Sequence, residues 1–222
     1  PLQGRRRRFS RFRQTDGVRT VTTDPEKGPG PQTVYKPDRL WYNTPYFPIF
    51  YSRRKGGSLL PYQFFPMIAR MRYITRWGLM RNTQPENIQE HSHMVAVLAH
   101  ALAVIENEKF GGQVDPGQVA VAALYHDASE ILTGDMPTPI KYDNPDIQGA
   151  YKAVEAVAEG KLLSMLPEDL RPVYDEILTM PDPHVRALVK AADKLSAYLK
   201  CVEERKAGNA EFRSAEEQTY AA

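Results

Sequence analysis

The sequence predicts an all-α protein, a helical bundle that follows a disordered N-terminal extension. After residue 62, apolar residues recur three and four positions apart through several segments, which is the spacing of an amphipathic helix. Helix-capping residues precede several of these segments, for example Asp115 before Pro116 and Asn144 before Pro145. The hydrophobic content of 42% is enough for a core, so one folded domain over residues 62–222 is expected.

Residues 1–60 form a basic extension rich in proline and glycine. They include four consecutive arginines, Arg5 to Arg8, and the alternating glycines and prolines of Lys27–Pro31. Neither a helical nor a strand period is sustained, so no secondary structure is predicted here. The segment is interpreted as disordered or non-native sequence, and a nucleic-acid-binding arm or a targeting peptide is the alternative.

The composition restricts the kind of protein and the kind of metal site. The 29 basic and 27 acidic residues nearly cancel, and no apolar run is long enough to cross a membrane. The single Cys201 excludes an internal disulfide and a cysteine-rich zinc site. A cytoplasmic protein without membrane association is therefore expected, and any metal site must use His, Asp and Glu.

A first helix is predicted over residues 62–75, because Phe64 and Ile68 fall on one helical stripe. The loop that follows carries Arg76 beside Trp77. This pair offers a fork for phosphate oxygens and a flat apolar wall for a sugar or a base. Such pairs also occur on ordinary surfaces, so the pair alone does not define a site.

A second helix is predicted over residues 86–107, and His91 falls on its apolar stripe. His93 and His100 fall elsewhere on the helical wheel. A single histidine on an apolar face is more often a core residue than a metal ligand. A second inward histidine on the next helix makes the ligand interpretation worth pursuing.

A third helix is predicted from the N-cap Asp115 to Gly134. His126 and Glu130 share one of its faces, and Asp127 lies about 100° from His126 around the helix. A buried histidine and aspartate need a partner or a metal ion, because an unpaired buried charge is costly. The alternative is an ordinary helix end with a salt bridge.

Three further helices are predicted, over residues 145–166, 168–178 and 183–206. Asp193 lies beside the apolar stripe of the last one. The alternative for this residue is a surface aspartate that pairs with Lys190 or Arg186. The candidates His91, His126, Asp127 and Asp193 thus lie on three predicted helices. Their two imidazoles and two carboxylates would suit one divalent ion such as Mn, Co, Zn, Fe or Ni.

The ordered pattern of His91, His126-Asp127 and Asp193 on helices resembles the HD-domain metal-dependent phosphohydrolases. Over residues 62 to 213 the chain resembles more specifically the bacterial HD-domain 5'-deoxynucleotidases. The segments that carry this resemblance are Arg76-Trp77, Glu90–Ser92, Tyr125–Glu130, Thr133–Pro139 and Tyr198–Cys201. The first 60 residues have no counterpart in that family, and the chain is expected to be truncated by about a helix at its C-terminus.

The resemblance implies a function and a set of site residues. The function is metal-dependent hydrolysis of deoxyribonucleoside 5'-monophosphates by a homodimer. The implied metal ligands are His91, His126, Asp127 and Asp193. The implied catalytic residues are Glu130, which would orient or deprotonate the attacking water, Asp135 and Trp77. The implied substrate-binding residues are Arg76, Trp77, His91, Asp127, Asp135, Met136, Pro137, Thr138 and Asp193.

Three other functions are compatible with parts of the sequence. An HD-domain hydrolase of nucleoside triphosphates or guanosine tetraphosphate is the first, although the Arg-Trp pair and the Thr-Gly-Asp loop favour monophosphates. A non-catalytic nucleotide-binding regulatory module is the second, and the intact ligands and Glu130 count against it. A nucleic-acid-binding protein is the third, but the basic residues of the N-terminal arm have no matching stripe in the folded part.

Overall fold

The computed structural model describes residues 51–53, 59–141 and 144–221, with side chains from residue 62 onward. The chain divides into two compact units, Pro1–Trp41 and Tyr42–Ala222, and every described residue lies in the second. The expectation for residues 1–50 therefore lies outside the described residues. Among the described helices, none is both long and apolar enough to cross a membrane.

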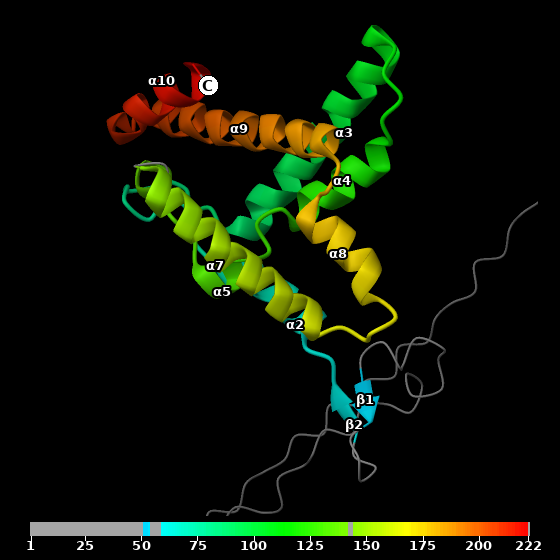
Figure 1. Ribbon diagram of the computed structural model, residues 1–222. Coiled ribbons are helices and arrows are strands. Elements are labelled where there is room, and N and C mark those ends of the chain that lie inside the picture. The colour runs from blue at the N-terminus through cyan, green and yellow to red at the C-terminus, as the bar shows by residue number, and fades with distance from the viewer. Residues whose placement is uncertain (1–50, 54–58, 142–143, 222) are drawn as a thin grey trace, which may run out of the picture. The chain divides into compact units, whose positions relative to one another are not determined.

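The described part of the chain is mainly helical, which confirms the predicted all-α fold (Figure 1). The longer helices are α3 (Ile88–Phe110), α4 (Pro116–Tyr125), α7 (Pro145–Ser164), α8 (Arg171–Thr179), α9 (Pro183–Lys206) and α10 (Arg213–Ala221). The shorter elements are α2 (Phe64–Ile68), η1 (Ala69–Tyr73), α5 (Glu130–Thr133), α6 (Thr138–Lys141) and η2 (Ala210–Phe212).

Two short strands precede the helices, where no secondary structure was predicted. β1 (Tyr51–Arg53) pairs antiparallel with β2 (Leu59–Pro61), with Ser52 opposite Leu60. The prediction was wrong for these residues because a three-residue strand is too short to display a period of two.

The central packing unit consists of α3, α4 and α9, which contact one another in all three combinations (Figure 1). Small residues such as Ala99, Ala103 and Ala123 are fully buried between the helices and permit their close approach. Asn87 caps α3 by accepting hydrogen bonds from the backbone N–H groups of residues 89 and 90. Gly111 ends this helix with φ at 73°, a left-handed conformation that glycine adopts without strain.

A second apolar cluster lies under the turn that follows α4. It consists of Phe64, Ala128, Leu162, Leu166 and Leu178, with tyrosines packed at its edge. The Phe64 ring, which is fully buried, lies 5.0 Å from the Tyr174 ring. Ala128 is itself fully buried in this cluster. Its packing therefore fixes the position of the turn that carries the neighbouring His126 and Asp127.

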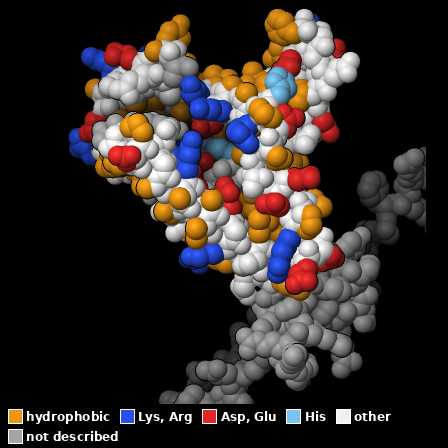
Figure 2. All heavy atoms as spheres, viewed as in Figure 1, with side chains coloured by type: hydrophobic (Ala, Val, Ile, Leu, Met, Phe, Trp, Pro, Cys, Tyr) orange, Lys and Arg blue, Asp and Glu red, His pale blue; other side chains and the backbone are white. Residues whose placement is uncertain are grey.

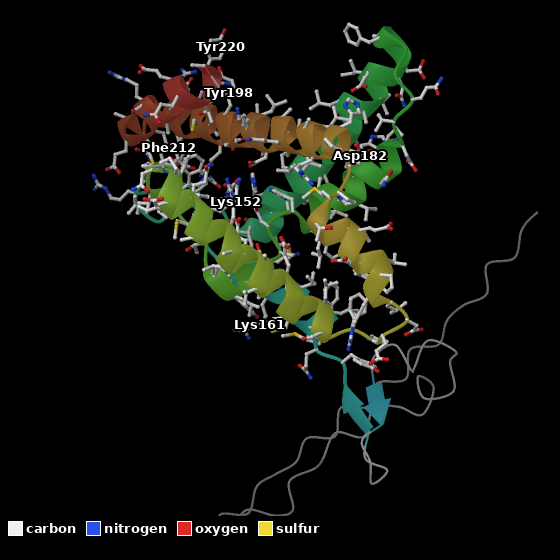
Figure 3. All side chains as sticks on the ribbon, viewed as in Figure 1. Lys152, Lys161, Asp182, Tyr198, Phe212 and Tyr220 are labelled. Atoms are coloured by element: carbon white, nitrogen blue, oxygen red, sulfur yellow. The ribbon has the colours of Figure 1, made fainter. Side chains whose placement is uncertain are left out.

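The C-terminal end of the chain folds back on α9. Tyr198 of α9 and Tyr220 of α10 lie side by side, with ring centroids 5.7 Å apart (Figure 3). Phe212 of η2 is fully buried and packs against Trp77, with ring centroids 5.2 Å apart. Neither η2 nor α10 was predicted from the sequence.

All the predicted helices except the last, over residues 183–206, have different bounds in the structure. The first, predicted over residues 62–75, is divided into α2 and the 3₁₀ helix η1. The third, predicted to continue to Gly134, ends at Tyr125 and resumes only at Glu130. Across the gap the backbone N–H of Ala128 bonds to the Tyr125 carbonyl, a tighter spacing than that of an α-helix. The fifth begins at Arg171 rather than at residue 168.

Candidate metal centre

His91 occupies the first turn of α3 and is fully buried. Its Nε2 lies 2.9 Å from Oδ1 of Asp193, and its Nδ1 lies 3.2 Å from the Ser196 hydroxyl. Asp193 and Ser196 are three residues apart on α9 and therefore face the same side. The alternative was a surface aspartate that pairs with Lys190 or Arg186, but Asp193 pairs with His91 instead, and Arg186 bonds to the Met180 carbonyl.

His126 caps the C-terminal end of α4, and the tautomer of its ring follows from its contacts. Its Nδ1–H donates to the Ala123 carbonyl over 2.8 Å, because a carbonyl oxygen can only accept. In the neutral imidazole this leaves the lone pair on Nε2. That atom is buried and has no hydrogen-bond partner, although Oδ2 of Asp127 lies 3.2 Å away. An unpartnered buried lone pair is the arrangement that a metal ion satisfies.

Asp127 lies between the two histidines in the turn after α4. Its Oδ2 is 3.2 Å from Nε2 of His126, 3.7 Å from Nε2 of His91 and 3.4 Å from Nη1 of Arg76. Burial alone would raise the pKa of Asp127, but the two imidazoles and the guanidinium outweigh it and hold the pKa well below its usual range. Burial opposes ionisation of Asp193 too, and its hydrogen bond to His91 reverses the effect and lowers the pKa.

The residues present fit a single metal ion. Ligand atoms about 2.1 Å from a shared ion lie about 3.0 to 4.2 Å apart. The separations of 2.9, 3.2 and 3.7 Å among His91, His126, Asp127 and Asp193 fall near that range. The candidate ligand atoms of His91, His126 and Asp193 all lie within 4.8 Å of one another. Two imidazoles with ionised carboxylates suit a borderline divalent ion.

The other three histidines do not join this cluster. His93 and His100 are exposed on α3. His184 pairs with Glu106, and the two side chains lie 2.8 Å apart. Figure 2 shows histidine and acidic side chains at the bottom of a hollow on the face in view, with lysine and arginine side chains along its rim.

Arg76 and Trp77 lie at the edge of this cluster, held by a residue that the sequence analysis did not identify. A single oxygen of Glu86, Oε2, accepts hydrogen bonds from Arg76 Nε over 3.1 Å and from Trp77 Nε1 over 2.9 Å. The Arg76 backbone N–H also donates to the Glu86 carbonyl over 2.9 Å. Arg76 and Glu86 are ten positions apart and joined by a loop, so no helical or strand periodicity relates them. The sequence therefore gave no indication of this contact.

Glu130 begins α5 and is buried, with one carboxyl oxygen that has no hydrogen-bond partner. Burial, reinforced by the carboxylates of Asp127 and Asp135, raises the pKa of Glu130 to about 9. Glu130 and His126 were predicted to share one face of a continuous helix. In the structure they lie on opposite sides of the turn between α4 and α5.

The loop after α5 supplies the other predicted substrate-binding residues. Asp135 is partly buried, and burial raises its pKa while the nearby Arg76 guanidinium opposes that shift. Met136 and Pro137 are also partly buried, whereas Thr138 is exposed at the start of α6. The structure thus brings Asp135 into the electrostatic neighbourhood of the metal cluster and leaves Thr138 at its margin.

Comparison with known proteins agrees with this geometry. A family model described as "5'-deoxynucleotidase YfbR-like" matches residues 63–222. A protein of Vibrio cholerae named 5'-deoxynucleotidase is 55% identical over 157 residues, which cover 70% of this chain and 81% of that protein. One of the same name from Shewanella oneidensis is 50% identical over 159 residues, covering 71% and 82%. The crystal structure of an HD-domain phosphohydrolase from Listeria innocua has a TM-score of 0.65 and 25% identity, covering 72% of this chain and 77% of that one.

Proposed function

Because the chain belongs to the YfbR-like 5'-deoxynucleotidase family, we propose that its buried centre hydrolyses deoxyribonucleoside 5'-monophosphates to a deoxynucleoside and phosphate. The observation that carries the proposal is the convergence of His91, His126 and Asp193, with Asp127 beside both histidines and the Arg76 guanidinium 3.4 Å from Asp127. A phosphate monoester needs both a cationic site for its oxygens and a group that handles the proton of water.

The four proposed ligands would hold one divalent metal. When bound, that metal supplies positive charge that favours the ionised form of nearby carboxyls, neutralises charge on the phosphoryl group and lowers the pKa of a water. His126 contributes Nε2, which its bond to the Ala123 carbonyl leaves free of a proton. For His91 to contribute Nε2, its proton must sit on Nδ1 and point to the Ser196 hydroxyl, 3.2 Å away.

Arg76 is the proposed phosphate ligand from the protein. An arginine has five N–H donors, of which Nε is bonded to Glu86 and one on Nη1 faces Asp127. The other donors are available to two oxygens of a phosphate in the fork geometry. The guanidinium would therefore fix the phosphate beside the metal ligands.

Glu130 is the proposed proton acceptor for the attacking water. Its carboxyl oxygen Oε2 is buried and has no hydrogen-bond partner among the described residues, so it is available to a water molecule. Asp135 lies near enough to influence Glu130 electrostatically and is proposed to contact the leaving group or the sugar. Trp77 is proposed to fill the space beside the sugar C2', with Met136, Pro137 and Thr138 of the loop along the remaining wall.

Two properties of the whole protein belong to this proposal. We propose a homodimer in the cytoplasm, which the sequence resemblance supports. Size-exclusion chromatography with light scattering distinguishes a dimer of this 25.2 kDa chain from a monomer.

Phosphate release from paired nucleotides tests the proposed function. The protein is stripped with a chelator, reloaded separately with Mn²⁺, Co²⁺ or Zn²⁺, and assayed with dAMP, dGMP, dCMP, dTMP and the matching ribonucleotides, and with dATP. Phosphate release from the deoxy monophosphates, with much less from ribo monophosphates and from dATP, is expected. Release only from triphosphates, or from none of these nucleotides with any metal, would refute the proposal.

A further inference from the structure

Glu86 is not one of the proposed metal ligands, and it does not belong to the proposed substrate-binding loop after α5. It nevertheless contacts both residues of the Arg-Trp pair. It directly precedes Asn87, the N-cap of α3. Its Oε2 accepts from Arg76 Nε over 3.1 Å and from Trp77 Nε1 over 2.9 Å. The carboxylate and the guanidinium are largely buried, with side-chain exposures of 17% and 13%. We propose that Glu86 is a positioning residue that sets phosphate capture through Arg76 and sugar selection through Trp77.

The contact with Arg76 determines the direction in which the guanidinium points. Glu86 holds Nε on one side, and Oδ2 of Asp127 lies 3.4 Å from Nη1 on the other. A planar guanidinium held at two corners has little freedom to rotate. Its remaining N–H groups are then fixed in one orientation before a phosphate arrives, which reduces the entropy that binding costs.

The contact with Trp77 holds a residue whose backbone is unfavourable. Trp77 has φ at 60°, in the left-handed region that a bulky side chain rarely adopts. The indole is held at two places, by the bond from Nε1 to Glu86 and by packing of its ring on the buried Phe212. Loss of the bond to Glu86 would leave the ring attached at Phe212 but free to tilt.

The loop that carries Arg76 and Trp77 is also held by contacts that do not use the Glu86 side chain. Its other end is fixed by Glu204, which accepts from the backbone N–H groups of Thr83 and Gln84. Its base is fixed by the backbone bond from residue 88 to residue 74 and by the bridge between residues 75 and 87. Removal of the Glu86 side chain is therefore expected to change the orientation of two side chains and to leave the loop folded.

The inference rests on the proposed function, and kinetics on dAMP and AMP test it in the full chain loaded with metal. Glu86→Ala is expected to raise KM for dAMP about tenfold or more, the size of effect that accompanies loss of a hydrogen bond to a charged group. The ratio of kcat/KM for dAMP to that for AMP should fall in the same variant. Metal content should equal that of wild type. Glu108→Ala, at an exposed carboxylate near the end of α3, is the matched control and should change none of these.

A double-variant comparison separates the two contacts. Trp77→Phe keeps an aromatic ring on Phe212 but removes the Nε1–H donor. If Glu86 acts on sugar selection through that donor, the dAMP to AMP ratio in the double variant Glu86→Ala/Trp77→Phe should equal the ratio in Trp77→Phe alone. A further fall in the double variant, by the full factor seen in Glu86→Ala, would overturn the assignment to Trp77.

The indole N–H resonance of Trp77 supplies a readout that needs no activity. The chain has only two tryptophans, Trp41 and Trp77, so comparison with Trp77→Phe assigns the signal. The Trp77 signal should move in both Glu86→Ala and Glu86→Gln, because a carboxylate acceptor is lost in each. Glu86→Gln retains an oxygen acceptor in the same place, so it carries the test if Glu86→Ala does not fold.

The outcomes distinguish this inference from the proposed function. Wild-type activity on dAMP, with KM, sugar ratio and indole signal unchanged in the Glu86 variants, would overturn the role of Glu86 and leave the function intact. Absence of wild-type activity on dAMP would overturn the proposed function. In that case an indole signal that does not move in the Glu86 variants would overturn the contact as well, whereas a signal that moves would support it.

Discussion

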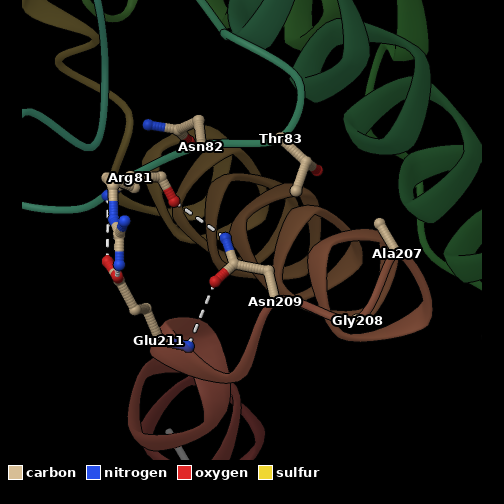
Figure 4. A pocket seen from close by; sticks show the side chains of 7 residues that line it. All are labelled: Arg81, Asn82, Thr83, Ala207, Gly208, Asn209 and Glu211. Carbon is tan, nitrogen blue, oxygen red and sulfur yellow. Dashed lines mark hydrogen bonds and ion pairs between the residues drawn. The ribbon is translucent and has the colours of Figure 1, made fainter.

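Glu204→Ala should destabilise the protein by removing the buried anchor of the loop that carries Arg76 and Trp77. Glu204 on α9 is 1% exposed. Its carboxylate accepts from the backbone N–H groups of residues 83 and 84, from the Thr83 hydroxyl, from Asn209 and from the Lys200 ammonium. Figure 4 shows the neighbouring part of this anchor, where Asn209 and Glu211 bond to the backbone and side chain of Arg81.

The size of the loss follows from the charge that is left behind. Lys200 is 6% exposed, and in Glu204→Ala its ammonium retains only the Gln84 carbonyl as a bonding partner among the described residues. Removing one partner of a buried ion pair costs about 3–5 kcal/mol of unfolding free energy. For a domain of this size each kcal/mol lowers Tm by roughly 2–4 °C, so a fall of roughly 6–20 °C is expected.

Thermal unfolding followed by circular dichroism measures this loss. Glu203→Ala is the matched control, since that carboxylate is adjacent but exposed, and its Tm should stay near that of wild type. The double variant Lys200→Met/Glu204→Leu removes both charges and should be less destabilised than Glu204→Ala. A Tm for Glu204→Ala close to that of the Glu203→Ala control would refute the reasoning.

The difference between wild type and Glu204→Ala should depend on pH. Burial alone would raise the pKa of Glu204, but hydrogen bonds from Lys200, Asn209 and Thr83 hold it well below its usual range. A carboxyl with a depressed pKa in the folded state stabilises that state above its unfolded pKa of about 4.3. The stability difference should therefore be full at pH 7 and should shrink as the pH falls below about 4.3.

The remaining predictions concern the metal centre and the extension. Ser196→Ala should weaken metal affinity about tenfold or more, measured by chelator competition, because His91 loses the partner that orients its ring; an affinity equal to that of wild type would contradict this. Asp127→Ala should lose metal by elemental analysis while keeping its helical circular dichroism, and full occupancy would argue against the site. Glu130→Ala should keep its metal but lose turnover by about 10²-fold or more, and undiminished kcat would exclude a role in proton transfer. Deletion of residues 1–60 should leave turnover and Tm nearly unchanged, and a large loss of either would show that the extension contributes to the fold or the site.

Helical periodicity identified the inward-facing residues on long helices. His91 on α3 and Asp193 on α9 lie on or beside apolar stripes, and the structure places them 2.9 Å apart. Each helix contributes its own stripe to a common core, so inward residues on different helices can be expected to meet. His91 and Asp193 could therefore be identified as candidates from the sequence without knowing which residues far apart in the chain are in contact.

Helical periodicity did not predict the turn between α4 and α5, where the chain leaves the helical conformation at the metal centre. The sequence from Asp115 to Gly134 has a continuous helical pattern, yet α4 ends at Tyr125. The turn presents His126 and the adjacent Asp127 to the same cluster, which 100° of separation on a straight helix would make harder. The His126 ring bonds to the Ala123 carbonyl at the end of α4. The spacing of apolar residues along the sequence gives no sign of such a bond between a side chain and the backbone.

Contacts between loops and distant helices were not predictable from a single sequence. Glu86 meets Arg76 and Trp77 through a loop that returns on itself, and Glu204 meets Thr83 across 121 positions. A glutamate at a helix start and another on a helix surface look alike in sequence whether or not they are buried. Their roles follow only from the burial and the partners that the fold provides.

Anomalous X-ray scattering from crystals of the wild-type protein loaded with Zn²⁺ or Mn²⁺ tests the metal centre most directly. The predicted result is one strong peak in each molecule, about 2.0–2.3 Å from a nitrogen of His91 and of His126 and from an oxygen of Asp127 and of Asp193. A peak elsewhere, a peak that contacts only some of these four side chains, or no peak at full metal loading would contradict it.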